Sequence, residues 1–282
     1  MILSGKARLA GVLGWPVRHS LSPRLHGYWL ERYGIDGAYL PLGAPPAALE
    51  RVVAALVDLG FRGFNATLPH KEPLLAFCDD VTPTARRIGA VNTVVVDGGR
   101  LLGDNSDAFG FAENLRAGAP SWRAAEGPAA VLGAGGAARA VIAALQDLGV
   151  PELRLTNRTE ARATDLAAAL AAPGLAPIRV LPWAERREAL SEAGLLVNTT
   201  TLGMAGQPPL DLALDALPRH ALVTDIVYAP LETPLLAAAR ARGNPVVDGL
   251  GMLLHQARPG FEAWFDRPPE VTDELRAFLL GA

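Results

Sequence analysis

Short apolar runs alternate with amphipathic segments along the N-terminal part of the chain. The apolar runs have the length typical of strands, and the segments between them repeat their apolar positions with the spacing of a helix. Strands separated by helices of this length predict parallel crossovers and an α/β sheet. The pattern predicts strands at 8–13, 38–42 and 63–66, and helices at 22–33 and 47–59, the second ending at Gly60.

Cap and turn signals delimit the next elements. Ser22 is the predicted N-cap of the first helix, and Pro23 suits its first turn. Further on, an Asp97-Gly98-Gly99 turn separates two short strands and predicts a β-hairpin. The hairpin strands are expected at 93–96 and 101–103, followed by a helix at 107–117.

A stretch rich in Gly, Pro and Ala, residues 118–127, predicts the connection into a second domain. That domain opens with a strand, a glycine loop and a helix in direct succession. Its predicted strands are 129–132, 153–156, 195–198, 221–225 and 245–247, and its first helix is 137–148.

Composition narrows the class of protein. The chain has 282 residues, 50% of them hydrophobic, and a formal net charge of -3, so it is long enough for two ordinary domains. That charge argues against a nucleic-acid partner, because phosphate binding needs a concentrated basic surface. Cys78 is the only cysteine, so no internal disulfide is expected, and neither metal-binding spacing nor a signal peptide or membrane span is found. We expect a cytoplasmic protein without a metal, either a monomer or a homodimer.

The glycine loop has the spacing of a dinucleotide-binding fingerprint, Gly133-x-Gly135-x-x-Ala138, between a predicted strand and a predicted helix. The first glycine permits a tight turn, the second lets the backbone approach a pyrophosphate, and the small alanine allows close packing of helix on strand. The N–H groups at the helix start then face the phosphates. The alternative is an ordinary turn between a strand and a helix.

The tip of the next strand distinguishes the two nicotinamide dinucleotides. NAD-binding domains carry an acidic residue there for the ribose 2′-OH, whereas this strand ends in Asn157-Arg158-Thr159. Arg158 can hold a 2′-phosphate with its planar guanidinium, and Arg162 adds a second positive charge. The pattern favours NADP, although two arginines at such a position can also simply face solvent.

Four polar stretches in the first domain follow or begin predicted strands, so they are expected to meet at one edge of the sheet. Together they offer hydroxyls, amides, a lysine and a carboxylate, which suit a small polyhydroxylated acid and a proton transfer. Each also has a structural explanation: Ser22 and Asp107 as helix caps, Lys71 as a surface lysine. The stretches are HSLSP (19–23), NATLPHK (65–71), AVNT (90–93) and DNSD (104–107).

The order of motifs resembles the shikimate dehydrogenase family over nearly the whole chain. The motifs are HSLSP, GFNATLPHK, GAVNTV, DNSDAFG, GAGGAAR, NRT, NTTTLGM, DIVYAPLETPLL and GLGMLLHQA. The resemblance implies an NADP-dependent reduction of 3-dehydroshikimate to shikimate. It also implies the fold class: an N-terminal α/β substrate domain plus a Rossmann-type dinucleotide-binding domain, with a cleft between them. The discontinuous substrate domain would be 1–106 and 250–282, and the cofactor domain 107–249.

The resemblance also implies roles for individual residues. Lys71 and Asp107 would be the catalytic pair, and Lys71 rather than the adjacent His70 would face the substrate. Ser20 and Ser22 would hold the carboxylate. The remaining substrate contacts would be Thr67, Asn92, Asp107, Tyr228 and Gln256. The cofactor would be lined by Gly133, Ala134, Gly135, Gly136, Ala137, Asn157, Arg158, Thr159, Arg162, Ile226 and Gly249.

The chain departs from the family pattern at Ala66, Ser106 and Ala108, where Val, Thr and Gly are more usual. These small changes bear on substrate preference rather than on the reaction. One alternative is a quinate/shikimate dehydrogenase with broader substrate use. Another is a sensor that binds a dinucleotide and a small acid without catalysis, which the presence of both Lys71 and Asp107 disfavours.

Overall fold

The computed structural model describes residues 2–281, which fold into two compact units. Unit 1 combines the residues up to Ser106 with those from Gln256 onward, and unit 2 is Asp107–His255. The second boundary between the units falls inside helix α8 (Leu250–Phe265). Within residues 2–281, no helix is both long and apolar enough to cross a membrane.

Unit 1 contains a mixed six-stranded sheet in the order β2-β1-β3-β5-β6-β4. β1 is parallel to both β2 and β3, while β5 runs antiparallel to β3 and β6. The predicted hairpin is confirmed, with Gly98 and Gly99 both at positive φ in its turn. The strands are β1 Arg8–Gly14, β2 Gly37–Gly43, β3 Gly63–Ala66, β4 Asp80–Val81, β5 Thr93–Asp97 and β6 Arg100–Asp104.

The helices of unit 1 include one correction to the sequence analysis. Ser22 was expected to cap α1 (Ser22–Arg32), but the N-cap is Leu21 and no side chain caps this helix. Leu21 already has helical dihedral angles, so Ser22 lies inside the first turn, where its hydroxyl is not placed to cap. The other helices are η1 Pro46–Ala48, α2 Leu49–Asp58, η2 Pro73–Ala76, α3 Pro83–Ile88 and α9 Asp273–Leu280.

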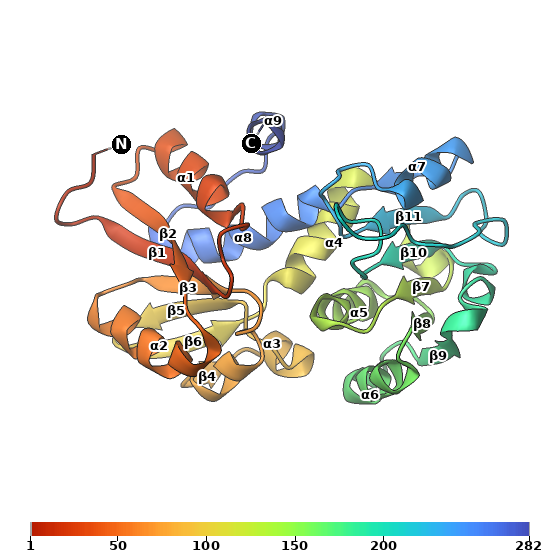
Figure 1. Ribbon diagram of the computed structural model, residues 1–282, viewed down its shortest axis with the longest axis horizontal. Coiled ribbons are helices and arrows are strands. Elements are labelled where there is room, and N and C mark those ends of the chain that lie inside the picture. Colours follow the sequence, from red (N-terminus) through yellow and green to blue (C-terminus); the bar gives the residue numbers. More distant parts are fainter. Residues whose placement is uncertain (1, 282) are drawn as a thin grey trace. The chain divides into compact units, whose positions relative to one another are not determined.

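Two apolar layers cover the sheet of unit 1, and Figure 1 shows α2 on one side of it and α1 on the other. On the α2 side, Val53 and Leu56 pack against Phe64 of β3 and Val94 of β5. On the α1 side, aromatic rings of α1 meet those of α8: Trp29 with Phe261, for example, at 5.2 Å between centroids. The edge of the sheet between these layers is where its polar side chains lie.

Unit 2 is a Rossmann-type domain by its sheet topology. Its six parallel strands run in the order β12-β11-β10-β7-β8-β9, which is the 3-2-1-4-5-6 arrangement of dinucleotide-binding domains read from the other edge. Figure 1 shows these strands side by side from β11 to β9. They are β7 Ala129–Leu132, β8 Leu153–Asn157, β9 Ile178–Pro182, β10 Leu195–Asn198, β11 Leu222–Asp225 and β12 Val246–Val247.

The helices of unit 2 bury the sheet with small and branched side chains. Ala138 and Val141 of α5 are fully buried, as are Leu132 of β7 and Leu196 of β10. Fully covered parallel strands read as continuous apolar runs, which is why the sequence located β7 and β10 to the residue. The helices are α4 Asp107–Gly118, α5 Gly136–Leu148, α6 Glu160–Leu170 and α7 Pro234–Ala241, with short 3-10 turns η3 Ala124–Glu126, η4 Trp183–Glu185 and η5 Glu188–Leu190.

Replacing Gly63 by alanine should strongly destabilise the protein. Gly63 has φ +153, and a Cβ there would collide with Trp264 Nε1 and with the Val94 carbonyl oxygen, which are themselves joined by a hydrogen bond of 3.0 Å. We expect Gly63→Ala to lower the free energy of unfolding by about 2 kcal/mol or more, as overpacking of a core does. Urea unfolding followed by circular dichroism measures the change.

The control is Gly27→Ala, in helix α1, where a Cβ would meet nothing within 4 Å. This change should be neutral or should stabilise by about 0.5–1 kcal/mol, because alanine is the better helix former. Equal unfolding midpoints for the Gly63→Ala variant and the unmodified protein would contradict the steric argument.

Candidate active site

The four polar stretches of unit 1 meet at the carboxyl ends of β1 and β3, as the sequence predicts. The Thr67 N–H donates to the Leu13 carbonyl at 2.8 Å, and the Trp15 N–H to the Leu68 carbonyl at 3.1 Å, so the chain segments that leave these strands stay together. Since β5 is antiparallel to β3, its amino-terminal end lies at the same edge, next to the carboxyl-terminal end of β6. The Asn92 N–H closes the group by donating to the Asp104 carbonyl at 3.0 Å.

His70 and Lys71 have different surroundings in this edge. His70 is 1% exposed, and its Nε2 lies 2.8 Å from the Ala44 carbonyl oxygen, so its ring is committed to the interior. Lys71 is only partly buried, and its backbone carbonyl accepts a hydrogen bond of 2.8 Å from the Val91 N–H. Lys71 is therefore the proton-transfer candidate of the two, and its backbone is held directly beside the segment that carries Asn92.

The side chain of Asn92 is buried and its orientation is defined by three donors. Its Oδ1 accepts hydrogen bonds from the Thr93 hydroxyl at 2.8 Å, the Ser106 N–H at 2.8 Å and the Ser106 hydroxyl at 3.1 Å. These three bonds fix the orientation of the amide, with its donor group, Nδ2, on the opposite side from the oxygen. A hydrogen-bond donor at this position suits a hydroxyl or carbonyl oxygen of a substrate.

Ser20 and Ser22 share the turn that leads into α1. The Ser22 N–H donates to the Ser20 Oγ at 3.3 Å, so the Ser20 hydroxyl can still donate its own proton. Ser20 is partly exposed and Ser22 is 8% exposed. Neutral hydroxyl donors of this kind can bind a carboxylate without supplying a competing acid.

The other predicted substrate residues lie in both units. Thr67 is partly buried at the end of β3, and its methyl group packs on Gly14 of β1. Asp107, 8% exposed, is the first residue of α4, and Gln256 is partly buried in α8. Tyr228 follows β11 in unit 2, and burial raises the pKa of its phenol, so it stays a neutral hydrogen-bond donor at ordinary pH.

The glycine loop of unit 2 has the geometry that a dinucleotide pyrophosphate requires. Gly133 has φ +106, and a Cβ there would lie 2.7 Å from the Thr199 hydroxyl, so only glycine fits. Gly135 and Gly136 are exposed, and a Cβ on either would meet nothing within 4 Å, which leaves open space in front of the loop. Gly135 is the N-cap of α5 and provides no side-chain cap, so the first turn presents its N–H groups to an anion.

Asn157 joins this loop to the next one. Its Oδ1 accepts a hydrogen bond of 3.2 Å from the Ala134 N–H, and its Nδ2 donates to the Thr159 carbonyl at 2.8 Å. Thr199, to which the sequence analysis gave no role, binds the loop from β10: its hydroxyl donates to the Leu132 carbonyl at 2.7 Å. The NTTTLGM motif was the only sequence signal for this contact.

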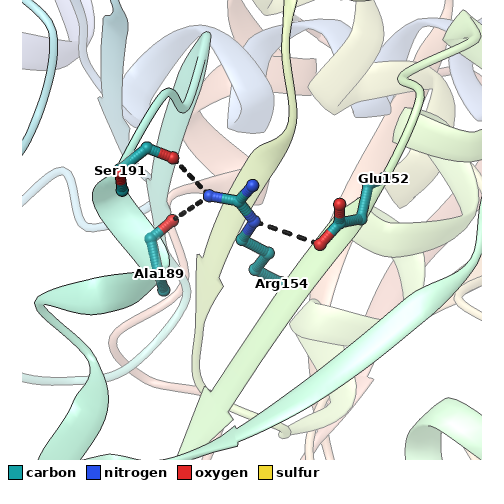
Figure 2. A network of polar contacts seen from close by, with 4 residues as sticks. All are labelled: Glu152, Arg154, Ala189 and Ser191. Carbon is teal, nitrogen blue, oxygen red and sulfur yellow. Dashed lines mark hydrogen bonds and ion pairs between the residues drawn. The ribbon is translucent and has the colours of Figure 1, made fainter.

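Two arginines of β8 and its following loop contrast sharply. Figure 2 shows Arg154 held by the carbonyls of Ala189 and Ser191 and by Glu152, whose Oε1 lies 3.1 Å from its Nε. Arg158, the residue directly after β8, is exposed. Within residues 2–281 its side chain makes no hydrogen bond or ion pair. Arg154 is thus a structural residue, whereas the guanidinium of Arg158 is available to a ligand phosphate.

Ile226 and Gly249, both predicted to line the cofactor, lie together. A Cβ on Gly249 would be 2.4 Å from the Ile226 carbonyl oxygen, a clash that glycine avoids. The backbone that carries Ile226 is held by Asp225, whose Oδ1 accepts from the Val227 N–H and the Asn198 side chain, both at 3.0 Å. Its other oxygen accepts from Thr233 at 2.8 Å. Asp225 is another residue that sequence reasoning did not single out.

The residues of unit 2 fit NADP: a glycine turn, an uncapped helix start and a free arginine where the 2′-phosphate would lie. Arg162 is also exposed, in the first turn of α6. Among residues 2–281, no three His, Cys, Asp or Glu side chains lie together in a way that could hold a metal ion.

Comparisons with known proteins agree on one family. The model of the shikimate dehydrogenase substrate binding domain matches residues 12–94. The chain is 64% identical to the shikimate dehydrogenase (NADP(+)) of Paramagnetospirillum magneticum over 280 residues, covering 99% of this chain and 100% of the relative. A solved structure of shikimate 5-dehydrogenase from Thermus thermophilus in complex with NADP(H) and shikimate is also similar, with a TM-score of 0.83 and 41% identity over 97% of each chain. A second, quinate dehydrogenase from Corynebacterium glutamicum in complex with NAD, has a TM-score of 0.91 and 31% identity, covering 98% of this chain and 99% of that one.

Asp225 generates a prediction about pH. Burial raises the pKa of its carboxyl, and the hydrogen bonds from Val227, Thr233 and Asn198 offset only part of this rise. Above the ordinary pKa and below the raised one, the folded protein binds more protons than the unfolded chain, so its stability falls as pH rises through this window. Asn at this position cannot ionise.

We therefore expect the stability of the unmodified protein relative to Asp225→Asn to decrease as pH rises above the ordinary pKa of an aspartate carboxyl, about 4. Urea unfolding at a series of pH values gives both free energies, with m-values checked for constancy. A difference that stays constant or increases with pH would contradict the assignment.

Proposed function

The chain belongs to the shikimate dehydrogenase family, and we propose that Lys71 and Asp107 are the catalytic pair with which it reduces 3-dehydroshikimate reversibly to shikimate, using NADP. The reaction serves the shikimate pathway, which leads through chorismate to the aromatic amino acids. One observation carries the site assignment. At the edge of the unit 1 sheet, the Val91 N–H donates a hydrogen bond to the Lys71 carbonyl and so holds Lys71 beside Asn92. This edge combines one partly buried lysine with neutral donors, which is the chemistry of an acid–base site for a polyhydroxylated acid.

When bound, the nicotinamide of NADP supplies or accepts the hydride. In the reducing direction, Lys71 in its ammonium form stabilises the negative charge that develops on the substrate carbonyl oxygen and donates a proton to it. In the oxidising direction, neutral Lys71 accepts the proton from the substrate hydroxyl. Asp107 orients the lysine and contacts the same hydroxyl.

Binding is assigned to neutral groups. Ser20 and Ser22 hold the substrate carboxylate, and the amide of Asn92 donates to a substrate oxygen. The other proposed substrate contacts are Thr67, Tyr228 and Gln256. For the cofactor we propose Gly133, Ala134, Gly135, Gly136 and Ala137 at the pyrophosphate, Asn157, Arg158, Thr159 and Arg162 at the 2′-phosphate, and Ile226 and Gly249 at the nicotinamide side.

The domain functions follow the same division. We propose residues 1–106 and 250–282 as the substrate domain and 107–249 as the NADP domain. That the protein works in the cytoplasm, as a monomer or a homodimer, stays a prediction.

Quinate is a second candidate substrate, because a quinate dehydrogenase in complex with NAD is among the similar structures. The unpartnered guanidinium of Arg158 favours NADP over NAD in this chain. One assay separates the alternatives: formation of the reduced nicotinamide with shikimate or quinate, each paired with NADP or NAD. Turnover of shikimate with NADP supports the proposal, and binding of both ligands without turnover would indicate a sensor.

Lys71→Ala should lower kcat by roughly 10²- to 10⁴-fold, the usual contribution of a positioned acid or base. The KM for shikimate should change much less, because neutral donors provide most of the binding. Lys6→Ala is the matched control, since Lys6 is the chain's one other lysine and is exposed. Near-normal kcat in the Lys71→Ala variant would remove this residue from the mechanism.

Arg158→Ala should weaken NADP binding by roughly 10- to 150-fold, which corresponds to a charge-assisted contact of about 1.5–3 kcal/mol. Binding of NAD, which lacks the 2′-phosphate, should hardly change. Titration of both dinucleotides by fluorescence or calorimetry measures the two effects. The control is Arg179→Ala in β9, another exposed arginine of the same sheet. Equal losses for NADP and NAD would point to the pyrophosphate or to folding instead.

A further inference from the structure

We propose that Asn198 is a positioning residue for the dinucleotide, whose buried side chain holds together the two chain segments that follow β10 and β11. These segments are residues 199–206 and 226–230. The inference rests on the proposed function, which assigns the pyrophosphate and the nicotinamide to the strand ends of unit 2. It adds a residue that is fully buried and therefore acts through its neighbours.

Asn198 lies where the order of the strands in unit 2 reverses. The sheet extends from β7 through β8 to β9 in chain order, and the next strand, β10, lies on the other side of β7. In open α/β sheets, ligands bind outside the carboxyl ends of the strands at such a reversal. Asn198 is the last residue of β10, and it is paired with Leu132 of β7 and Asp225 of β11. It is therefore the central residue at the end of the sheet where a dinucleotide would bind.

The side-chain amide of Asn198 uses both of its hydrogens and both acceptor positions of its oxygen. Its Nδ2 donates to Asp225 Oδ1 at 3.0 Å and to the Leu202 carbonyl at 3.1 Å. Its Oδ1 accepts from the Thr200 hydroxyl at 2.7 Å and from the Thr200 N–H at 3.1 Å. A backbone N–H can only donate and a carbonyl can only accept, so a single orientation of the amide fits these partners.

On one side, these bonds hold the segment after β10 against the glycine loop. The Thr199 hydroxyl donates to the Leu132 carbonyl at 2.7 Å, and a Cβ on Gly133 would lie 3.0 Å from the methyl group of Thr200. The Thr200 hydroxyl also accepts from the Leu202 N–H at 3.1 Å, which closes a tight turn. Because Gly133 packs on this segment, a displacement of Thr200 would disturb the loop proposed to hold the pyrophosphate.

On the other side, Asn198 holds the segment that begins with Ile226. Its backbone carbonyl accepts from the Ile226 N–H at 3.1 Å. Its side chain orients Asp225, whose Oδ1 also accepts from the Val227 N–H at 3.0 Å. The residue proposed at the nicotinamide is thus attached to Asn198 both directly and through Asp225.

Replacing Asn198 by alanine removes the four side-chain bonds but keeps the strand pairing, which is made by backbone groups. One bond between the two segments would remain, from the Ala205 N–H to the Ala229 carbonyl at 2.8 Å. The cofactor would then have to order both segments as it binds, and this ordering lowers affinity. The loss should be the same for NADP and NAD, because the segments flank the pyrophosphate and the nicotinamide, which both dinucleotides contain.

The experiment measures the dissociation constants of NADP and NAD by calorimetry for the unmodified protein, Asn198→Ala and Asn244→Ala. Asn244 is the matched control, because it is also buried and its Nδ2 donates to three carbonyls, those of Pro218, Arg219 and Ala221. It lies two residues before β12, at the amino ends of the parallel strands and away from the glycine loop. We expect Asn198→Ala to raise both dissociation constants about 10-fold. Asn244→Ala should leave both unchanged, even with a lowered Tm.

Steady-state assays of shikimate oxidation give a second readout. At saturating NADP, the kcat of Asn198→Ala should stay within about 3-fold of normal, because a loss of binding alone raises KM and leaves kcat unchanged. The pattern also differs from that expected for Arg158→Ala, which should weaken NADP and spare NAD.

Thr200→Val carries the test if Asn198→Ala does not fold. It removes the hydroxyl that donates to Asn198 Oδ1, so it should also raise both dissociation constants. If the two residues act through one network, the double variant should bind no more weakly than Asn198→Ala alone. A dissociation constant raised by the product of the two separate increases would overturn the coupling.

The outcomes separate this inference from the proposed function. An unmodified protein that does not bind NADP would overturn both. If the unmodified protein binds NADP and the folded Asn198→Ala and Thr200→Val variants keep normal dissociation constants, only the positioning role is overturned. An equal loss of affinity in Asn244→Ala, or a loss in Asn198→Ala that is confined to NADP, would overturn it as well.

Discussion

The side-chain amide of Asn65 is the contact on which the proposed substrate site depends. It lies on β3 and is bonded to β2 through Tyr39 and to β5 and the preceding residue through Thr93 and the Asn92 carbonyl. A buried amide left without partners costs about 1–3 kcal/mol. The hydrogen bonds of Asn65 therefore favour the native register of β2, β3 and β5 where the backbone hydrogen bonds between the strands end. The segment that carries Lys71 follows β3, and Asn92 directly precedes β5, so both are attached to strands that this amide joins.

In unit 2, too, polar side chains join neighbouring segments at the ends of the strands. There the side chains of Asn198 and Asp225 join β10 to β11, and Asn157 joins the glycine loop to the loop after β8. Beyond the last ladder bond of a strand, backbone N–H and C=O groups need other partners. Side-chain amides and a buried carboxylate provide them, so the loops that would carry a dinucleotide are positioned before any ligand arrives.

The same physics explains which sequence predictions were accurate. The strands β3, β7 and β10 were located to the residue, because they are short apolar runs with clear boundaries and are buried on both faces. β4 was missed because its two residues, Asp80 and Val81, form no apolar run, and β9 because it is an edge strand with an exposed arginine and a terminal proline. The capping role predicted for Ser22 was wrong, because Leu21 already has helical dihedral angles and Ser22 therefore lies inside the first turn of α1.

The sequence by itself determined the two-part α/β organisation, the glycine loop, the arginine that favours NADP and the family, since each depends on a pattern within a short segment. Only the tertiary structure decided that His70 is turned to the interior, that the side-chain oxygen of Asn92 accepts from three donors, and that Tyr39 is bonded to Asn65. Tyr39 and Asn65 are 26 residues apart, on different strands. A hydrogen bond between two side chains at such a separation leaves no periodicity in the sequence, because its geometry exists only once the strands have paired.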